Sequence, residues 1–384
     1  MNKQWITFAN EIKELYKKDF VPLHEPTFDE MEIEFVTDCV RSGWVSSVGK
    51  YVDRFEKELA EFTGVKRAVA VVNGTSALHI ALKVAGVQSN DEVFMPSLTF
   101  VATANAVSYL QAIPHFVDVS EFTLGLDPVK LEEYIKDIGE MKNGHLVNKQ
   151  TGRIIRAVVP MHTFGHPVDL DPLIELCERY NVVLVEDAAE SLGSYYKGKH
   201  TGGFGKISAL SFNGNKIMTT GGGGAILTND DKFADYAKHL TTTAKVPHKW
   251  AYEHDEIGYN YRMPNINAAL GCAQLQKIPT FIEQKRQLTQ VYENLVNCVD
   301  GVTLFKEPIN TKGNYWLQTL VIEQTDSRDA VLEFLNEHGV MSRPIWTPMN
   351  ELGPFKHMPK ADLTVTKQLK NSLINIPSTP LKVK

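Results

Sequence analysis

Between residues 67 and 230 the chain alternates short apolar runs with segments of helical periodicity. The runs are apolar on both faces and rich in β-branched or small residues. In order they read RAVAVV, DEVFMP, PHFVDV, IIRAVVPMHTF, VVLVEDA, KISALSF and GAILTND. This alternation predicts an α/β fold with a mainly parallel central sheet and helices on both of its faces. Ligands of such sheets usually lie at the carboxyl ends of the strands.

The pattern differs on either side of this region. Residues 1–20 show amphipathic helical spacing, and two more helices are expected over residues 31–43 and 51–64. After about residue 245 a long helical stretch comes before short strand patterns and a last helix, which suits a smaller α+β domain. We therefore expect an N-terminal helix with a leading segment (1–24), a large domain (25–245) and a small C-terminal domain (246–384).

Charge and cysteine content narrow the classes of protein. The 384 residues carry a formal net charge of −6 without a long basic run, which argues against nucleic acid as a partner. The four cysteines lie too far apart for a zinc site or a disulfide framework, so neither a metal nor disulfides are expected. The N-terminus lacks the apolar core of a secretion signal, and no stretch has the apolar length of a membrane helix. These features predict a cytoplasmic protein that is not bound to a membrane.

One lysine stands in a segment of small and polar residues. The segment is FNGNKIMTTGGGGAILTND, in which Lys216 precedes the glycines Gly221–Gly224. Glycines let a backbone approach a ligand closely, and the lysine could neutralise a phosphate, form a Schiff base or be solvated in a loop. A Walker-type phosphate loop does not match, because GxxxxGK is absent and the lysine comes before the glycines.

Two acids, Glu186 and Asp187, stand where the apolar run VVLVEDA ends. Burying a carboxylate is costly unless it meets a cation or hydrogen-bond donors. A helix cap or a structural ion pair would explain an isolated acid at this place. Lys216, however, follows the next strand along the chain, so two successive strands can bring a lysine and an acid to one crevice.

Polar residues also open a helix after the first strand. Asn73, Gly74, Thr75 and Ser76 follow the run RAVAVV, and free backbone N–H groups, the helix dipole and two hydroxyls there suit a phosphate. An ordinary N-cap is the alternative. Ser211, at the end of the run KISALS, would add another hydroxyl.

An aromatic residue completes the set. Phe100 follows Pro96 at a strand-to-helix turn. Core packing is the common role of a phenylalanine, but a ring at the edge of the sheet could equally stack on a planar ligand. Pyridoxal phosphate is planar, carries a phosphate, forms a Schiff base with a lysine and needs an acid at its ring nitrogen. It accounts for all four features together.

The order of these motifs resembles a known family. From about residue 25 to the C-terminus the chain carries, in sequence, SGWVSSVGKYVDRFEKELAEFTG, NGTSALHIAL, PSLTFVATANAV, PHFVDV, VEDAAESLGS, GGFGKISALSFNGNKIMTTGGGGAI, GYNYRMPNINAALGCAQL and GVMSRPIWTPM. Together they are similar to the sugar aminotransferases of the DegT/DnrJ/EryC1/StrS type, a branch of the aspartate aminotransferase superfamily with fold type I. The resemblance implies an α/β domain that binds pyridoxal 5'-phosphate and a smaller C-terminal α+β domain.

The resemblance also implies roles for individual residues. By position, Lys216 is the Schiff-base lysine and Asp187 is the partner of the pyridine nitrogen. The remaining cofactor contacts within the chain are Gly74, Thr75, Ser76, Phe100, Glu190 and Ser211. Asn260 and Arg262, in GYNYRM, match a segment that in the family reaches the cofactor phosphate of the neighbouring subunit. A homodimer with composite active sites is therefore expected.

Two positions depart from the family pattern. Glu190 stands near the cofactor's phenolic oxygen where Gln is common, so this acid is expected either to be protonated or to face a donor. Gly222 stands where an acid is often found. By contrast Lys216 is retained, whereas related sugar dehydratases carry His there. Transamination is thus favoured over dehydration.

The implied reaction moves an amino group from L-glutamate to a nucleotide-linked keto sugar. The motif VEDAAESLGS and the N-terminal helix resemble the LegC-type branch, which makes 4-amino sugars of the bacillosamine and legionaminic acid pathways. We therefore expect a UDP- or GDP-linked 2-acetamido-4-keto-deoxyhexose as substrate and a product for lipopolysaccharide or another surface glycan. Two alternatives remain: a 3-keto-sugar aminotransferase, and a regulatory protein that binds the cofactor without catalysis.

Substrate contacts are expected from the loop SGWVSSVGK and from aromatic residues near NYWLQTL and RPIWTPM. The candidates are Trp44, Ser46, Ser47, His162 and Trp346. For His162 a hydrogen-bonded core histidine is an equally good interpretation.

Overall fold

The apolar runs form the central sheet of the large domain. The computed structural model describes residues 3–323 and 327–381, so the outermost residues of the first and third predicted parts lie outside the described residues. In spatial order the strands are β1 (Arg67–Val71), β11 (Gly224–Thr228), β10 (Ile207–Ser211), β7 (Val183–Asp187), β6 (Ile155–Val158), β2 (Glu92–Pro96) and β3 (Ile113–Val117). Neighbours from β10 to β3 are parallel, and β11 runs antiparallel to both of its neighbours. The mainly parallel sheet is confirmed.

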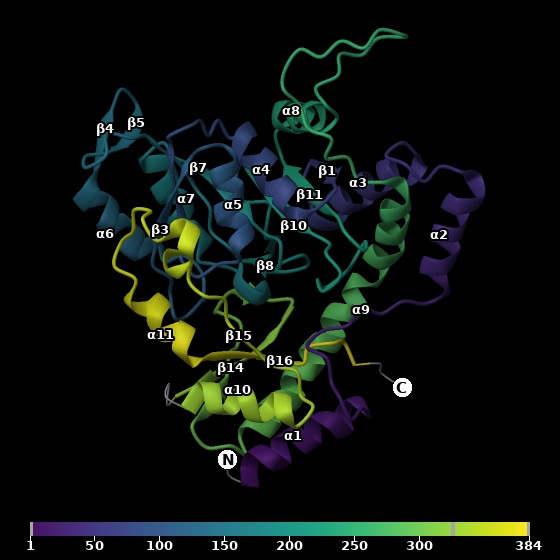
Figure 1. Cartoon of the computed structure of the whole chain (residues 1–384), viewed down its shortest axis with the longest axis vertical. Coiled ribbons are helices and arrows are strands. Elements are labelled where there is room, and N and C mark those ends of the chain that lie inside the picture. Colours follow the sequence, from purple (N-terminus) through teal and green to yellow (C-terminus); the bar gives the residue numbers. More distant parts are fainter. Residues whose placement is uncertain (1–2, 324–326, 382–384) are drawn as a thin grey trace.

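Helices cover both faces of this sheet, as predicted (Figure 1). One face carries α4 (Gly74–Val84), α5 (Val101–Tyr109) and α8 (Asp231–Thr241), and the other carries α3 (Lys50–Thr63), α6 (Pro128–Ile138), α7 (Leu170–Arg179) and α9 (Asn265–Val296). Successive strand residues point to opposite faces of the sheet. Val185 therefore packs against the helices of the first face, and Leu184 packs against those of the second. Both positions are apolar, which explains why the strands appear as continuous apolar runs.

A second core lies below the large domain in Figure 1. Its antiparallel sheet has the order β12 (Val302–Leu304), β14 (Gln318–Ile322), β16 (Leu373–Ile376) and β15 (Arg343–Pro344). The helices α1 (Lys3–Tyr16) and α10 (Arg328–Glu337) pack there together with the C-terminal half of α9. The first half of α9 packs instead on α3 and α2 (Glu30–Ser42). The first and last parts of the chain thus share one core, and the exact domain boundaries stay a prediction.

Shorter elements fill the connections. They are the hairpin β4 (Gly139–Lys142) and β5 (His145–Asn148), the small sheet of β13 (Thr311–Lys312), β8 (Tyr195–Tyr196) and β9 (Lys199–His200), helix α11 (Thr364–Ser372) and the 3₁₀ turns Thr163–Gly165, Met349–Glu351 and Gly353–Phe355. The sequence patterns do not predict the hairpin or α11, because such short elements carry little periodicity. Among the described helices, none is long and apolar enough to cross a membrane.

An arm and an apolar patch mark the surface. Residues 243–259 extend away from the body next to α8 (Figure 1), and Trp250, Tyr252 and Ile257 on this arm are largely exposed.

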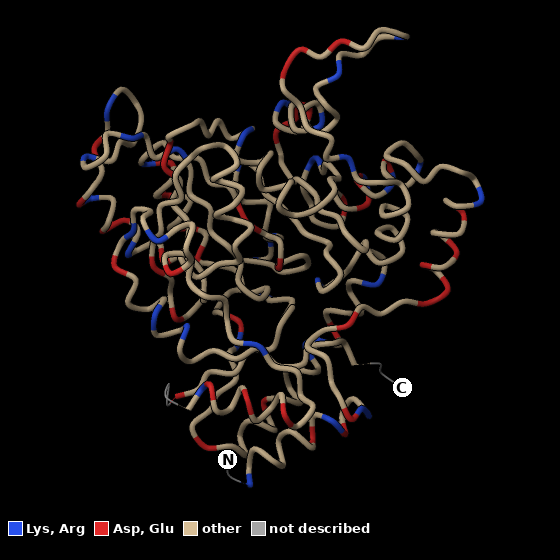
Figure 2. The backbone as a smooth tube through the Cα atoms, viewed as in Figure 1, with Lys and Arg blue, Asp and Glu red and all other residues tan. Residues whose placement is uncertain are grey.

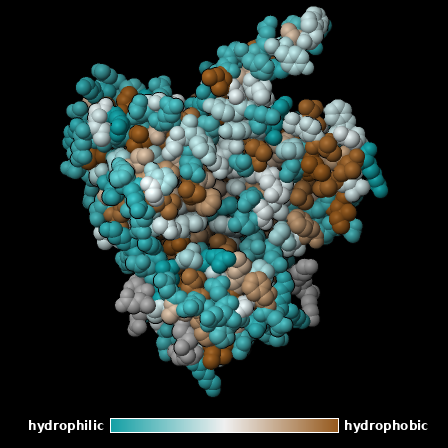
Figure 3. All heavy atoms as spheres, viewed as in Figure 1, coloured by the Kyte–Doolittle hydropathy of each residue, from teal (hydrophilic) through white to brown (hydrophobic). Residues whose placement is uncertain are grey.

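Apolar side chains also gather on the side where α2 lies (Figure 3). This patch includes Ile33, Val40, Val45 and Val48. Lys, Arg, Asp and Glu residues are spread along the outer helices and loops (Figure 2), but several acids, among them Glu186, Asp187 and Glu190, are buried.

Candidate active site

A pocket of about 320 Å³ opens at the carboxyl edge of the sheet, where β1, β2, β7 and β10 end. The large domain forms its floor, and Trp316 and Trp346 close it from the segments beside β14 and β15. The residues predicted from sequence that lie in its wall are Gly74, Thr75, Phe100, Asp187, Glu190, Ser211, Lys216 and Trp346. The topology therefore brings together motifs that are far apart in the sequence.

One end of the pocket is suited to an anion. Helix α4 begins directly after β1, and Asn73 caps it by accepting from the amide of Ser76 (2.8 Å). A Cβ on Gly74 would lie 2.7 Å from the Cβ of Ser211, so glycine allows this close approach. Within the described part of the chain, the hydroxyls of Thr75 and Ser211 have no hydrogen-bond partner, although both residues line the pocket. The helix dipole and these hydroxyls can bind a phosphate.

The glycine run after Lys216 serves backbone packing. A Cβ on Gly224 would lie 2.6 Å from the carbonyl carbon of Asn73, so glycine lets β11 pass beside the start of α4. A Cβ on Gly222 would have no atom within 4 Å, and the Gly222 carbonyl accepts from Asn267 Nδ2 (3.1 Å). These contacts do not explain why position 222 lacks an acid.

The two acids at the end of β7 have different surroundings. Asp187 lines the pocket, and its Oδ2 accepts from the Thr103 hydroxyl (2.7 Å). Burial raises the pKa of Asp187, and the Thr103 hydrogen bond opposes this shift. Glu186 accepts instead from His162 and from three backbone amides of the loop 202–205. Glu186 therefore stabilises a loop, and Asp187 is the acid available to a ligand.

Lys216 reaches the pocket from the loop after β10. Its Nζ lies 3.1 Å from Glu190 Oε1 and 3.9 Å from the centroid of the Trp316 ring. Burial raises the pKa of Glu190 to about 7, while Lys216 and the amide of Phe164, 2.9 Å from Oε2, act in the opposite direction. Protonation and a facing donor were alternatives for Glu190, and the structure shows donors at both carboxylate oxygens together with a raised pKa.

Aromatic side chains form the rim of the pocket. Phe100 stands at the N-cap position of α5, is 48% exposed and faces Trp346 edge-on with 6.3 Å between ring centroids. Trp346 also packs against Phe164, with 5.1 Å between centroids. Phe100 lies at the edge of the sheet in the pocket wall, where a half-exposed ring is free to cover a planar ligand.

His162 lies in the core rather than in the pocket wall. It is fully buried, its Nε2 pairs with Glu186 Oε2 (3.0 Å), and its Nδ1 accepts from the amide of Val168 (3.3 Å). Both ring nitrogens are used within the chain, so the structure supports the core histidine and not a substrate contact.

The loop with Trp44, Ser46 and Ser47 stays outside the pocket within the described residues of a single chain. Asn265, at the start of α9, fixes this loop: its Nδ2 donates to the Trp44 carbonyl and its amide donates to the Ser46 carbonyl (both 2.6 Å). Trp44 is largely exposed. Contact between this loop and a substrate therefore remains a prediction.

Asn260 and Arg262 also lie outside the pocket of their own chain in the described residues. They stand at the base of the arm beside β1, because the Val72 amide donates to the Tyr261 carbonyl (2.8 Å). Arg262 Nη2 donates to Asn260 Oδ1 (2.9 Å). A role in the pocket would require a second chain, which is what the family resemblance implies.

Phe164 and Asn314 support the site without a signal in the sequence patterns. The buried Phe164 has left-handed backbone angles (φ 55°, ψ 19°), and its amide contacts Glu190. Asn314 is also buried, donates to the Glu190 carbonyl (2.9 Å) and accepts from the Trp316 amide (2.8 Å). Both residues act by fixing backbone geometry, which residue type alone does not reveal.

The pocket fits pyridoxal 5'-phosphate. Thr75 and Ser211 offer free hydroxyls for the phosphate, Asp187 offers a buried carboxylate for the ring nitrogen, and Lys216 offers an amine for the aldehyde. In residues 3–323 and 327–381, no group of three His, Cys, Asp or Glu side chains is arranged to hold a metal ion.

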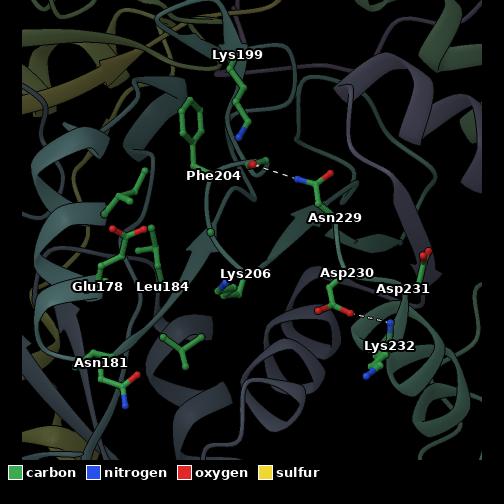
Figure 4. A pocket seen from close by; sticks show the side chains of 16 residues that line it. Glu178, Asn181, Leu184, Lys199, Phe204, Lys206, Asn229, Asp230, Asp231 and Lys232 are labelled. Carbon is green, nitrogen blue, oxygen red and sulfur yellow. Dashed lines mark hydrogen bonds between the residues drawn. The ribbon is translucent and has the colours of Figure 1, made fainter. Parts of the chain in front are cut away.

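A larger hollow of about 980 Å³ lies at the opposite edge of the sheet (Figure 4). Lys206, Asn229 and Lys232 line it at the surface. The acid Asp230 there caps α8 by accepting from the amide of Lys232 (2.8 Å). None of the Lys, Asp and Glu side chains that line this hollow is buried, whereas the pocket at the carboxyl edge has the buried acids Asp187 and Glu190.

Comparisons with known proteins agree with this geometry. Residues 26–382 match the DegT/DnrJ/EryC1/StrS aminotransferase family. GDP-perosamine synthase of Vibrio cholerae is 36% identical over 363 residues, 94% of each chain. UDP-4-amino-4-deoxy-L-arabinose--oxoglutarate aminotransferase of Shewanella sediminis is 32% identical over 78% of this chain and 74% of its own. The crystal structure of DesI in the presence of its TDP-sugar product has a TM-score of 0.82 at 27% identity, covering 93% of this chain and 87% of that one.

The family match extends over nearly the whole chain, including every motif that lines the pocket. It confirms fold type I, the aminotransferase class and pyridoxal 5'-phosphate as the cofactor, and it favours an enzyme over a regulatory protein without catalysis. The chain belongs to the DegT/DnrJ/EryC1/StrS aminotransferase family and is a transaminase that depends on pyridoxal 5'-phosphate.

Proposed function

We propose that this enzyme transfers the amino group of L-glutamate to a nucleotide-linked 4-keto-6-deoxy sugar and so produces a 4-amino sugar for a surface glycan. The sugar would be a UDP- or GDP-linked 2-acetamido-4-keto-deoxyhexose. Names of relatives support this class, since they include a GDP-linked sugar, a UDP-linked 4-amino sugar with oxoglutarate, and a TDP-sugar product. The nucleotide differs among them, so both UDP and GDP stay in the proposal.

The observation that carries the proposal is the meeting of an amine, a carboxylate and an anion site in one pocket. Lys216, Asp187 and the start of α4 with Thr75 all line it. Each comes from the end of a different strand, and no two of them are neighbours in sequence. Amino transfer needs all three groups around one cofactor.

Different residues of this chain would hold the cofactor and move the proton. The cofactor, when bound, accepts the electron pair of the carbon–hydrogen bond that breaks. Asp187, buried and held by Thr103, would keep the ring nitrogen protonated. Lys216 would move the proton between substrate carbon and cofactor carbon in both half-reactions. Thr75 and Ser211 would hold the phosphate while the lysine is free.

The sugar nucleotide would enter over the aromatic rim. Phe100 and Trp346 face each other at the mouth of the pocket and offer apolar surface to a sugar or a base. Trp44, Ser46 and Ser47 would supply an exposed ring and hydroxyls from the loop between α2 and α3. In this proposal His162 has no contact with the substrate.

The active enzyme would be a homodimer with composite sites. Asn260 and Arg262 lie outside the pocket of their own described chain, at the base of an arm that exposes Trp250 and Tyr252. The apolar patch around Ile33 offers a further surface for a second copy (Figure 3). Arg262 of one chain would then complete the phosphate site of the other.

A complementation experiment tests the composite site. Lys216→Ala and Arg262→Ala chains, each impaired alone, are unfolded together, refolded and assayed. Random pairing should restore about a quarter of the wild-type activity, because half of the dimers then contain one intact site. No recovery, despite dimers of normal size in light scattering, would contradict a shared site.

Trapping of the cofactor tests the assignment of Lys216. Purified protein with pyridoxal 5'-phosphate should absorb visible light, and borohydride should fix the cofactor to Lys216, as read by peptide mass spectrometry. A colourless protein, or a label on another lysine, would contradict the assignment of Lys216 as the lysine that binds the cofactor.

The substrate is tested separately. A panel of UDP- and GDP-linked keto sugars is incubated with L-glutamate, and 2-oxoglutarate release is followed. NMR of the product then locates the amino group, at C4 if the proposal holds and at C3 if the 3-keto alternative holds. Formation of the amino sugar with another amino donor, but not with L-glutamate, would overturn the donor assignment.

We also propose a cytoplasmic location. The four cysteines are free thiols, with Cys39, Cys177 and Cys272 buried and Cys298 exposed. Free thiols are typical of a reducing compartment. Fractionation of cells that express the native chain would test this.

A further inference from the structure

We propose that Glu190 and Trp316 form a holding site for the Lys216 amine whenever that amine is not bonded to the cofactor. This inference rests on the proposed role of Lys216 as the lysine that binds the cofactor. Glu190 and Trp316 would act as positioning residues, because they act through the lysine that both of them contact.

Two attractive contacts meet at the same nitrogen. Lys216 Nζ lies 3.1 Å from Glu190 Oε1, and the same atom lies 3.9 Å from the centroid of the Trp316 ring. A carboxylate and the face of an indole both attract an ammonium group, and more strongly where water is scarce. The side chains of Lys216 and Glu190 are only 12% and 1% exposed. The pocket therefore offers a defined place for the free amine.

The Glu190 carboxylate is oriented from its other oxygen. The Phe164 amide donates to Oε2 (2.9 Å), which leaves Oε1 for Lys216. Phe164 adopts a left-handed conformation (φ 55°) that is unfavourable for a bulky residue. Packing of its ring on Trp346 holds that conformation. A strained backbone thus aims one carboxylate oxygen at the lysine.

Trp316 is held by three hydrogen bonds, one from its ring and two from its backbone. Its Nε1 donates to the Asn215 carbonyl (2.7 Å), its amide donates to Asn314 Oδ1 (2.8 Å), and its carbonyl accepts from Lys285 Nζ (3.0 Å). Asn215 directly precedes Lys216 in the chain. The ring and the loop that carries the lysine are therefore tied together.

Asn314 joins the two walls of the holding site. Besides accepting from the Trp316 amide, its Nδ2 donates to the carbonyls of Glu190 and Leu192 (both 2.9 Å). A Cβ on Gly165 would lie 1.8 Å from Asn314 Oδ1, so glycine at position 165 is what lets this amide lie against the loop. The distance between carboxylate and ring is thereby set.

Two other titratable groups act on Lys216 through charge, Asp187 and His24. Burial raises the pKa of Asp187, and burial together with Lys285 and Lys216 lowers the pKa of His24 far below its usual range. His24 is therefore neutral near pH 7. Among the described groups that face Lys216, Glu190 is the one that changes charge near that pH.

Amine labelling in the loaded enzyme tests the holding site. Enzyme with bound pyridoxamine 5'-phosphate, in which Lys216 is free, is pulsed with trinitrobenzenesulfonate, and the labelling of Lys216 is measured by peptide mass spectrometry relative to the exposed Lys206. Trp316→Leu and Glu190→Gln should each raise this ratio about tenfold, because one attraction is lost. Trp316→Phe keeps a ring and should restore most of the protection.

The pH dependence separates holding from simple burial. In the wild type the ratio should fall between pH 6 and pH 8 as Glu190 ionises, whereas the isosteric Glu190→Gln variant should show no such step. Unchanged ratios in both Glu190→Gln and Trp316→Leu would overturn the holding site.

Labelling of the enzyme with bound pyridoxal 5'-phosphate distinguishes failure of the holding site from failure of the proposed role of Lys216. There Lys216 should be fully protected in all variants. Equal labelling of Lys216 with either form of the cofactor would overturn the proposed role of the lysine, and leave the contacts with Glu190 and Trp316 to be judged by the variants alone.

Discussion

The two edges of the central sheet present lysines in opposite surroundings. Lys216 follows β10 at the carboxyl edge, in a pocket where its side chain is 12% exposed. Lys206 precedes the same strand and faces the open hollow at the amino edge (Figure 4). Both edges also carry a capped helix start, with Asp230 at α8 and Asn73 at α4, but beside α4 the hydroxyls of Thr75 and Ser211 have no partner in the described residues.

This difference shows that size is a poor guide to chemistry. The hollow at the amino edge is about 980 Å³ and the pocket at the carboxyl edge about 320 Å³. Only the smaller one combines buried ionisable groups with unsatisfied donors among the described residues. Low dielectric makes each of those groups act more strongly on a ligand.

The largest expected effect comes from removing the lysine at the carboxyl edge. Lys216→Ala should lower kcat on the order of 10⁴-fold, since both the covalent anchor and the proton carrier are lost. Lys206→Ala, the matched change at the other end of β10, should leave kcat unchanged. Steady-state assays measure kcat of both variants. Comparable losses of kcat would contradict the different roles of the two edges.

A smaller loss should follow from neutralising the buried acid. Asp187→Asn should reduce kcat by about 10² to 10³-fold, because the ring nitrogen loses its charged partner. Burial raises the pKa of Asp187, so its carboxylate costs folding energy at neutral pH. The cofactor-free variant should therefore be at least as stable as wild type in urea. A variant that is both inactive and unstable would point to a structural acid instead.

Ionisation of Glu190 should make the stability contributed by the carboxyl edge depend on pH. The pKa of Glu190 is raised to about 7, so its contribution to stability is full below pH 4.5 and is lost as the pH rises through 7. The free energy of unfolding of cofactor-free wild type should thus fall relative to Glu190→Gln between pH 5 and pH 8. Urea titrations at pH 5 and pH 8 measure the free energy of unfolding of both proteins. An equal change with pH in wild type and in Glu190→Gln would contradict the prediction.

The smallest effect is expected at the amino edge. Asp230→Ala removes the cap of α8, where the carboxylate accepts from the amides of Lys232 and Phe233. The free energy of unfolding should drop by about 1 kcal/mol with kcat unchanged. Thermal unfolding and activity are measured on the same sample, and a loss of activity without a loss of stability would assign chemistry to this edge.

Much of the site could be predicted because each residue stands at a strand end. Asp187, Ser211, Thr75 and Phe100 follow separate apolar runs, and parallel strands bring their carboxyl ends to one edge. The strand pattern does not tell which of two neighbouring acids enters the pocket. That depends on which face of β7 each side chain takes, and Glu186 turned out to serve a loop.

The sequence by itself determined the succession of strands and helices along the chain and the type of cofactor, and it singled out Lys216 as a candidate, because apolar periodicity and polar residues at strand ends are local properties. Only the tertiary structure decided that His162 is a core residue, that Glu190 faces Lys216, and that Trp316 lies beside the lysine. Those pairs join residues from different elements, and their distances follow from how loops pack, which no local pattern encodes.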